Sequence, residues 1–141
     1  MDEQMIALVK ASLKELQPHA GAVFATFQSK LAQRAPELAY RYDEVDPERQ
    51  GELLFEKLAI ALGGVRFLDR LVPALGGVGL DAGSASLTSC DFARLSEVLI
   101  AAFAEVSGNR FDPCIGAAWT TLFEELSWHM FEAQSGKGTA A

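Results

Sequence analysis

Few side chains in this sequence have types and spacings suited to catalysis or metal binding. The strongest metal ligands and nucleophiles are two cysteines and two histidines: Cys90, Cys114, His19 and His129. Their spacing matches no metal site, and no nucleophile–base pair or phosphate-binding loop accompanies them. His129 is followed by Met130, but neighbours on a helix point about 100° apart, so one metal ion cannot easily use both. We therefore predict no catalytic residue and no enzymatic activity.

The charge of the chain excludes several classes of partner. Its 141 residues carry a net charge of −7, whereas nucleic acids and anionic membranes both require a basic face. No apolar run approaches the ~20 residues that span a bilayer, and the acidic start, Met1–Gln4, is unlike a signal peptide. We expect a cytoplasmic protein that does not insert into a membrane. Its cysteines should be free thiols, with Cys114 acting as a small buried hydrophobe.

The dominant hydrophobic period is that of an α-helix. Apolar residues recur at intervals of three and four in five segments: Ile6–Leu16, Val23–Leu31, Leu54–Val65, Leu95–Val106 and Ile115–Met130. No segment alternates in the manner of a β-strand. The pattern predicts an all-α protein, with Glu124 and Glu125 on a solvated helix face.

Capping residues and prolines mark the ends of the same segments. Asp46-Pro47 and Asp112-Pro113 each place a capping carboxylate before a proline at the first helical position. Ser89 is expected to cap the fourth segment. Because no repeat or linker is visible, we expect one domain over residues 1–134 and a frayed tail over residues 135–141.

The segment Gly76–Gly83 differs from the rest of the chain. It holds four glycines among eight residues, each of which costs a helix roughly 0.5–1 kcal/mol relative to alanine. We expect any helix there to be short or irregular. The segment loosely resembles a dinucleotide-binding loop, but no strand precedes it, so that function is not expected.

Six short stretches occur in an order and spacing typical of globins. They are Phe24–Leu31, Ala35–Leu38, Gln50–Phe55, Leu71–Leu75, Asp91-Phe92 and Ala118-Trp119. Over residues 4–134 the chain resembles bacterial single-domain haemoglobins and the globin half of flavohaemoglobins. The resemblance implies a globin fold, a three-over-three helical sandwich. It places the distal (E) helix at Gln50 and the start of the proximal (F) helix at Leu71–Leu75.

The resemblance also shows which cofactor ligand has been lost. In globins the proximal histidine binds the haem iron, and counting without gaps from either side puts that position at Ala82, which cannot ligate iron. A shifted register offers only residues that are not usual haem ligands: Gly79, Leu80, Asp81, Gly83 and Ser84. The family's tyrosine and glutamate, which hydrogen-bond around the proximal imidazole, are replaced by Phe92 and Gln134.

The distal side is only partly retained. The tyrosine that hydrogen-bonds bound oxygen in the family is replaced by Gln28, and the phenylalanine that wedges the haem by Tyr42, whereas Gln50 and Leu54 match. The three polar side chains either line a pocket, or point to solvent or bond one another across a filled core. The predicted pocket or cofactor-contact set is Gln28, Tyr42, Gln50, Leu54, Ala82, Phe92 and Trp119. Phe92 and Trp119 are expected to be core packing.

These observations favour a haem-free globin that acts as a sensor or binding module. The space left by the cofactor would be refilled by side chains, collapse, or hold an apolar small molecule such as a fatty acid; a partner protein is also possible. The alternative is a haem protein with unusual ligation, through Cys90, a distal group, His129 or His19, that binds oxygen or nitric oxide. A nitric oxide dioxygenase is least favoured, because the chain has no reductase domain. The helix faces indicate no particular oligomeric state.

Overall fold

The computed structural model describes residues 1–65, 68 and 87–132, and over these residues the chain is all-α, without a strand. The longer helices are α1 (Glu3–Leu16), α2 (Ala20–Arg34), α4 (Pro47–Gly63), α6 (Ser89–Ser107) and α7 (Pro113–Ser127). The shorter elements are η1 (Gln17–His19), α3 (Pro36–Ala39), η2 (Tyr40–Tyr42), η5 (Gly108–Arg110) and the π-helical turn η6 (Trp128–Glu132). The five periodic segments of the sequence are therefore confirmed as helical, Val65 lying just beyond the end of α4.

The helix starts confirm some of the predicted caps and correct others. The side chain of Asp112 accepts a hydrogen bond from the Ile115 backbone N–H, as expected. For α6 the prediction of Ser89 was wrong by one residue: Thr88 is the cap, in a reciprocal capping box with Asp91. Asp46 precedes Pro47 as predicted, but within the described residues its side chain makes no capping hydrogen bond.

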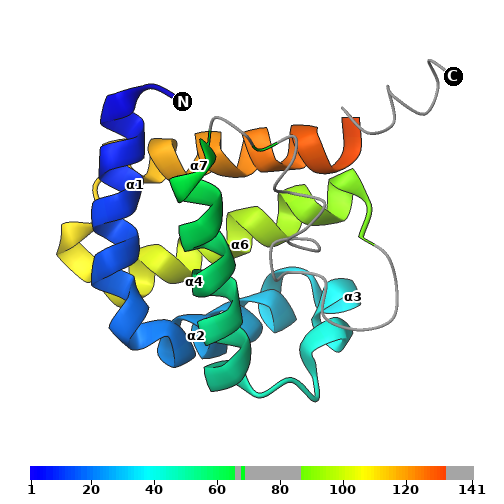
Figure 1. Cartoon of the computed structure of the whole chain (residues 1–141). Helices are drawn as coiled ribbons and strands as arrows, with labels where there is room; N and C mark the ends of the chain where they lie inside the picture. The colour runs from blue at the N-terminus through cyan, green and yellow to red at the C-terminus, as the bar shows by residue number, and fades with distance from the viewer. Residues whose placement is uncertain (66–67, 69–86, 133–141) are drawn as a thin grey trace, which may run out of the picture.

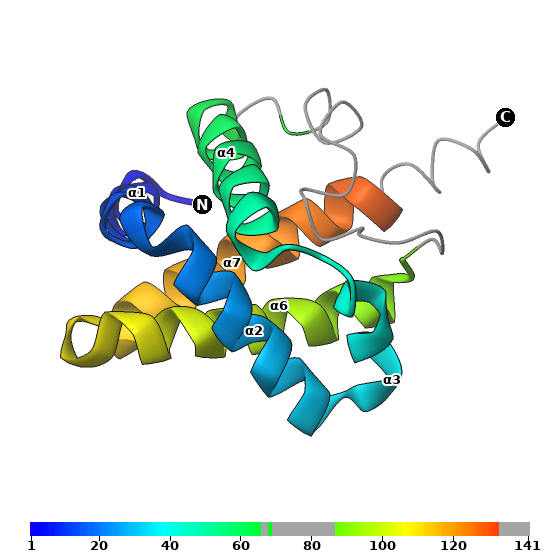
Figure 2. The same ribbon diagram turned by 90° about the horizontal axis from the view of Figure 1, so that it is seen from below.

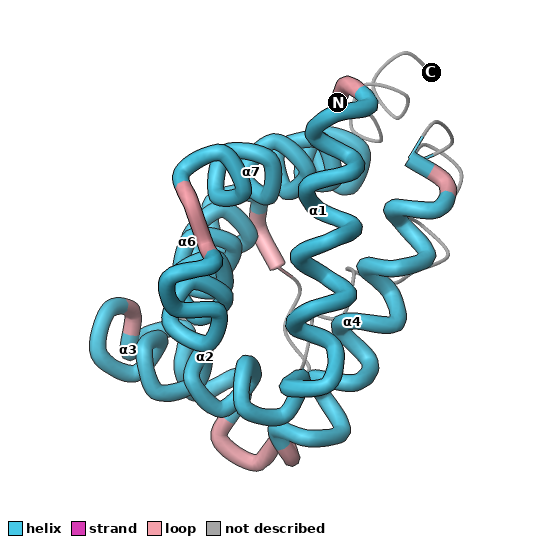
Figure 3. The backbone as a smooth tube through the Cα atoms, turned by 90° about the vertical axis from the view of Figure 1, so that its left-hand side faces the viewer, coloured by secondary structure: helices cyan, strands magenta, loops and turns pink. Residues whose placement is uncertain are grey.

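The helices form two crossed layers. In Figure 1, α1 and α4 run upright beside each other, and α6 and α7 run across behind them. The side view in Figure 3 places α1 and α4 on one side and α6 and α7 on the other. From below, α2 crosses α6, and it contacts both α6 and α4, so it joins the two layers (Figure 2).

The crossing of α2 and α4 depends on a glycine. A Cβ atom added to Gly51 of α4 would lie 2.3 Å from the carbonyl oxygen of Ala20, at the start of α2. That distance is far shorter than a van der Waals contact. The atom that the Cβ would meet belongs to the backbone, which cannot move aside as a flexible side chain could. Gly51 therefore allows the two helices to approach until their backbones nearly touch.

The core is continuous and rich in aromatic rings. One buried cluster takes residues from α1, α2, α4, α6 and α7. Trp119 of α7 lies at its centre, with its ring 4.6 Å from Phe103 of α6 and 5.9 Å from Phe123. The indole N–H of Trp119 donates to the hydroxyl of Ser12 in α1 at 2.9 Å, in a buried position. This bond satisfies the single polar group of the indole and links α1 to α7.

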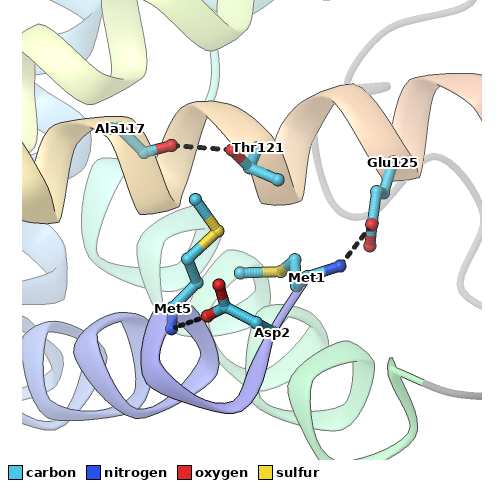
Figure 4. Close-up of polar contacts among 6 residues, drawn as sticks. All are labelled: Met1, Asp2, Met5, Ala117, Thr121 and Glu125. Carbon is cyan, nitrogen blue, oxygen red and sulfur yellow. Dashed lines mark hydrogen bonds and ion pairs between the residues drawn. The ribbon is translucent and has the colours of Figure 1, made fainter.

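The start of α1 also contacts α7 through charge. Figure 4 shows the Met1 ammonium group 2.7 Å from a carboxylate oxygen of Glu125, while Asp2 caps α1 by accepting from the Met5 N–H. Glu125 was expected on a solvated helix face; it is half-buried and pairs with the Met1 ammonium group, a contact that the sequence did not predict. Glu124 is exposed, as expected.

Several sequence predictions lie outside the described residues. These are the glycine-rich segment Gly76–Gly83, the proximal stretch Leu71–Leu75, Ala82, Gln134 and the tail over residues 135–141. Among the described helices, none combines the length and apolarity needed to cross a bilayer.

The helix crossing yields a stability prediction. Gly51→Ala should lower the free energy of unfolding by about 1–3 kcal/mol, because the new methyl group must push α2 and α4 apart. Gly63→Ala is the matched control in the same helix, since no atom lies within 4 Å of the added Cβ. It should be neutral or stabilising by up to about 1 kcal/mol. Urea unfolding followed by circular dichroism measures both, and equal effects would contradict the proposed role of Gly51.

Candidate functional site

Tyr42, predicted on the distal side of a pocket, is packed into the core instead of facing open space. Tyr42 is only 2 % exposed to solvent. Its ring makes edge-to-face contacts with Phe24 at 5.7 Å and with Phe27 at 5.4 Å, and these two rings also contact each other. Edge-to-face pairs add to the stability gained by burial alone. Three aromatic rings from α2 and η2 therefore form one packed group, which we call the distal aromatic cluster.

Gln28 is hydrogen-bonded to the backbone that follows this cluster. Its amide nitrogen donates to the carbonyl oxygens of Tyr42 at 2.9 Å and Val45 at 3.3 Å. An amide NH₂ has two hydrogens, so both of its donors are used. Gln28 thus ties α2 to the corner between η2 and α4. Gln28 therefore bonds the backbone of this corner, and these contacts are not bonds to the side chains of Tyr42 or Gln50.

The two residues that match the family's distal helix both lie early in α4. Gln50 is half-buried and Leu54, one turn later, is fully buried. Leu54 belongs to the same core cluster as Phe24, Phe27 and Tyr42. Leu54 is therefore part of the same core as these rings, whereas Gln50 is only half-buried.

Phe92 and Trp119 are fully buried, as expected for core packing. The ring of Phe92 lies 6.2 Å from Phe123 and 6.0 Å from Phe131. Phe123 in turn stacks on Trp119. These contacts place Phe92 between Phe131 of η6 and the aromatic rings of α7.

The residues able to bind iron are dispersed. Cys90 and Cys114 are both exposed, so the prediction that Cys114 is buried was wrong: it lies in the first turn of α7, on the side facing solvent. His19 is exposed, and His129 is half-buried in η6. The Nδ1 atom of His129 is buried and has no hydrogen-bond partner among the described residues. No group of three or more histidine, cysteine or acidic side chains in the described part of the chain is placed to hold a metal ion.

A groove that the sequence did not reveal lies beside Phe92. It has a volume of about 260 Å³ and runs between α6 and the end of α7. Phe92 and Phe123 lie buried at its base, Ile100 and Trp128 line it with partly exposed apolar side chains, and Glu97 and Glu124 also line it. Of the predicted pocket residues, Phe92 lines this groove. The spacing of these residues shows that they share a helix face, but only the packing shows that the two faces meet.

Two ion pairs connect the corner around α3 and η2 to the start of α6. Arg94 pairs with Glu37, and Arg41, which is buried, lies 4.0 Å from Asp91. Two hydrogen bonds lower the pKa of the Glu37 carboxyl below its ordinary value. The larger effect comes from the backbone N–H of Glu37 itself, and the smaller from Arg94.

The role of Gln28 can be tested by truncation. Gln28→Ala should lower the free energy of unfolding by about 1–2 kcal/mol, because two hydrogen bonds to backbone carbonyls are lost. Gln33→Ala, at an exposed position of the same helix, makes the same chemical change away from that corner. It should leave stability within about 0.5 kcal/mol. A Gln28 variant as stable as the control in urea unfolding would show that these bonds contribute nothing.

The Glu37–Arg94 pair predicts a pH dependence of stability. Because the pKa of Glu37 is lower in the folded chain than its ordinary 4.5, its stabilising effect is complete above that value and is lost as the pH falls through the folded pKa. The wild type should therefore be slightly more stable than Glu37→Gln near pH 7, and this difference should shrink as the pH falls below 4.5. Glu44→Gln, an exposed neighbour, is the control. A difference between wild type and Glu37→Gln that does not shrink as the pH falls would contradict the assignment.

Compared with known proteins, the chain matches no model of a protein family, and no curated protein matches it. The resemblance to globins therefore stays a prediction from the sequence.

Proposed function

We propose that this chain is a haem-free member of the globin fold, a three-over-three helical sandwich, that works as a non-enzymatic sensor or binding module. The order and relative lengths of its helices support the fold. A short α3 follows α2, a long α4 crosses α2 at a glycine, and α6 and α7 form a long pair at the end. This order of short and long helices supports the proposed fold.

The observation that carries the functional proposal is the packing of the distal residues. A haem pocket needs space and polar groups directed at the iron-bound ligand. Here the Tyr42 ring packs against Phe24 and Phe27, and both amide hydrogens of Gln28 are bonded to backbone carbonyls. The side chains expected to serve a cofactor are used to build the core, so the distal side does not fit haem.

The available iron ligands support the same conclusion. Ala82 stands at the position that the resemblance assigns to the proximal histidine, and an alanine side chain has no atom that can bind iron. Cys90 is exposed in the first turn of α6. His19 is exposed as well. His129 lines a separate hollow with Met1 and Val65. Because the described cysteines and histidines lie away from the distal aromatic cluster, the described residues favour binding of an apolar small molecule or a partner protein over oxygen binding or nitric oxide oxidation.

Haem binding is tested directly by absorption spectroscopy. The protein is purified from cells supplied with a haem precursor, and its spectrum is recorded before and after stepwise addition of hemin. We expect no Soret peak in the purified protein and no saturable, stoichiometric shift during the titration, because the distal residues are already packed against one another.

A stoichiometric Soret peak would overturn the proposal. Cys90→Ala, His129→Ala and His19→Ala would then identify the ligand, since the variant that removes the iron bond changes the position of the peak. Those three variants should otherwise have spectra identical to that of the wild type.

A further inference from the structure

The groove between α6 and α7 has the dimensions of a short helix-binding site. The two helices are joined by only a few residues and lie side by side in opposite directions (Figure 2). On α6 the groove extends from Phe92 to Ile100, which at 1.5 Å per residue is about 12 Å, or roughly two turns of a helix. Its volume of about 260 Å³ suits one or two apolar side chains better than a large ligand.

The groove has an apolar floor and an exposed aromatic rim. Phe92 and Phe123 are buried at its base, and Ile100 is half-buried. Trp128, at the Phe92 end, is 51 % exposed although tryptophan is a large apolar side chain. Exposed tryptophan beside an apolar hollow is typical of the residues that dominate protein–protein binding energy.

The walls of the groove carry the carboxylates that are left unpaired on these two helices. Asp91 lies near Arg41, Glu105 pairs with Lys30 and Glu125 pairs with Met1. Across the described residues, Glu97 and Glu124 have no such cation, and both line the groove. The one basic residue of α6, Arg94, is bound to Glu37.

We propose that this groove binds a basic amphipathic helix of a partner protein. The apolar side chains of such a helix, spaced three and four residues apart, would enter the hollow over Phe92 and Phe123 and pack against Trp128. Lysine or arginine side chains beside them would reach Glu97 and Glu124. A second copy of this chain fits poorly, because it would bring the same two carboxylates to the interface. The inference rests on the proposed function as a binding module and gives that module a site and a class of partner.

The probe is a fluorescein-labelled peptide of about 14 residues, long enough to form a helix when bound. It carries leucine every three to four residues, with lysine at the positions beside the leucines. Fluorescence anisotropy measures its affinity for the intact chain. We expect saturable binding in the micromolar range that weakens as salt is added. A peptide of the same composition with the leucines scrambled, and one with glutamate in place of lysine, should bind at least tenfold more weakly.

Two sets of variants assign the binding to the groove. Trp128→Ala should weaken binding about tenfold, and Glu97→Gln with Glu124→Gln about three- to tenfold. The matched control is Glu52→Gln with Glu56→Gln, two exposed positions of α4. It changes the net charge equally and should leave affinity within about twofold.

Three results would overturn the inference: no binding of the basic amphipathic peptide, equal weakening by both glutamate pairs, or equal binding of the scrambled peptide. The glutamate pairs lie at exposed positions, so they keep the test valid even if Trp128→Ala disturbs folding. Hemin absorption and peptide anisotropy are independent measurements. If a Soret peak appears and the peptide still binds through the groove, only the haem-free function is overturned. If no Soret peak appears and the peptide does not bind, only the proposal that the groove binds a basic helix is overturned.

Discussion

The arrangement of this protein depends on the close contact between α2 and α4 at Gly51. Because no Cβ separates them, the Ala20 carbonyl of α2 lies against the backbone of α4. The contact fixes α4 across α2 at a short distance, and α2 contacts α6 in turn, so the two layers of helices are joined through it. The rings of Phe24 and Phe27 follow within two turns of the crossing and fill the space beside it. A bulkier residue at this point would open that space, since close-packed cores do not absorb even a methyl group without movement.

Polar side chains in the interior serve to join elements that are distant in sequence. Gln28 binds carbonyls of the corner before α4, and Ser12 binds the indole of Trp119. Each satisfies a group whose burial or approach would otherwise cost free energy. Gln28 and Tyr42, which the resemblance assigns to the distal side, both take part in such internal contacts, and this supports the proposed haem-free function.

The surface that we propose as a partner-binding site lies on the outer face of α6 and α7. There the salt bridges formed with other helices leave Glu97 and Glu124 free of ion pairs among the described residues, beside an apolar groove and the exposed ring of Trp128. Carboxylates beside apolar surface favour a partner that is itself both basic and apolar. A packed interior with a distinctive outer face is consistent with a module that works by binding.

By itself, the sequence determined the helices and some of their ends, because the hydrophobic period and the capping residues act within a few neighbouring positions. It predicted Asp112 as a cap correctly and missed the start of α6 by one residue, since Thr88 and Ser89 can both accept the same kind of bond. The candidate site was only partly predictable. The sequence identified Tyr42 and Gln28 as candidate site residues, but the helix packing decided which groups they contact. Packing also decided that Cys114 is exposed and that Glu125 pairs with Met1. The bond from Trp119 to Ser12 spans 107 positions, and the groove exists only where two helix faces meet. Such contacts depend on how helices cross, which local patterns of three and four residues do not encode.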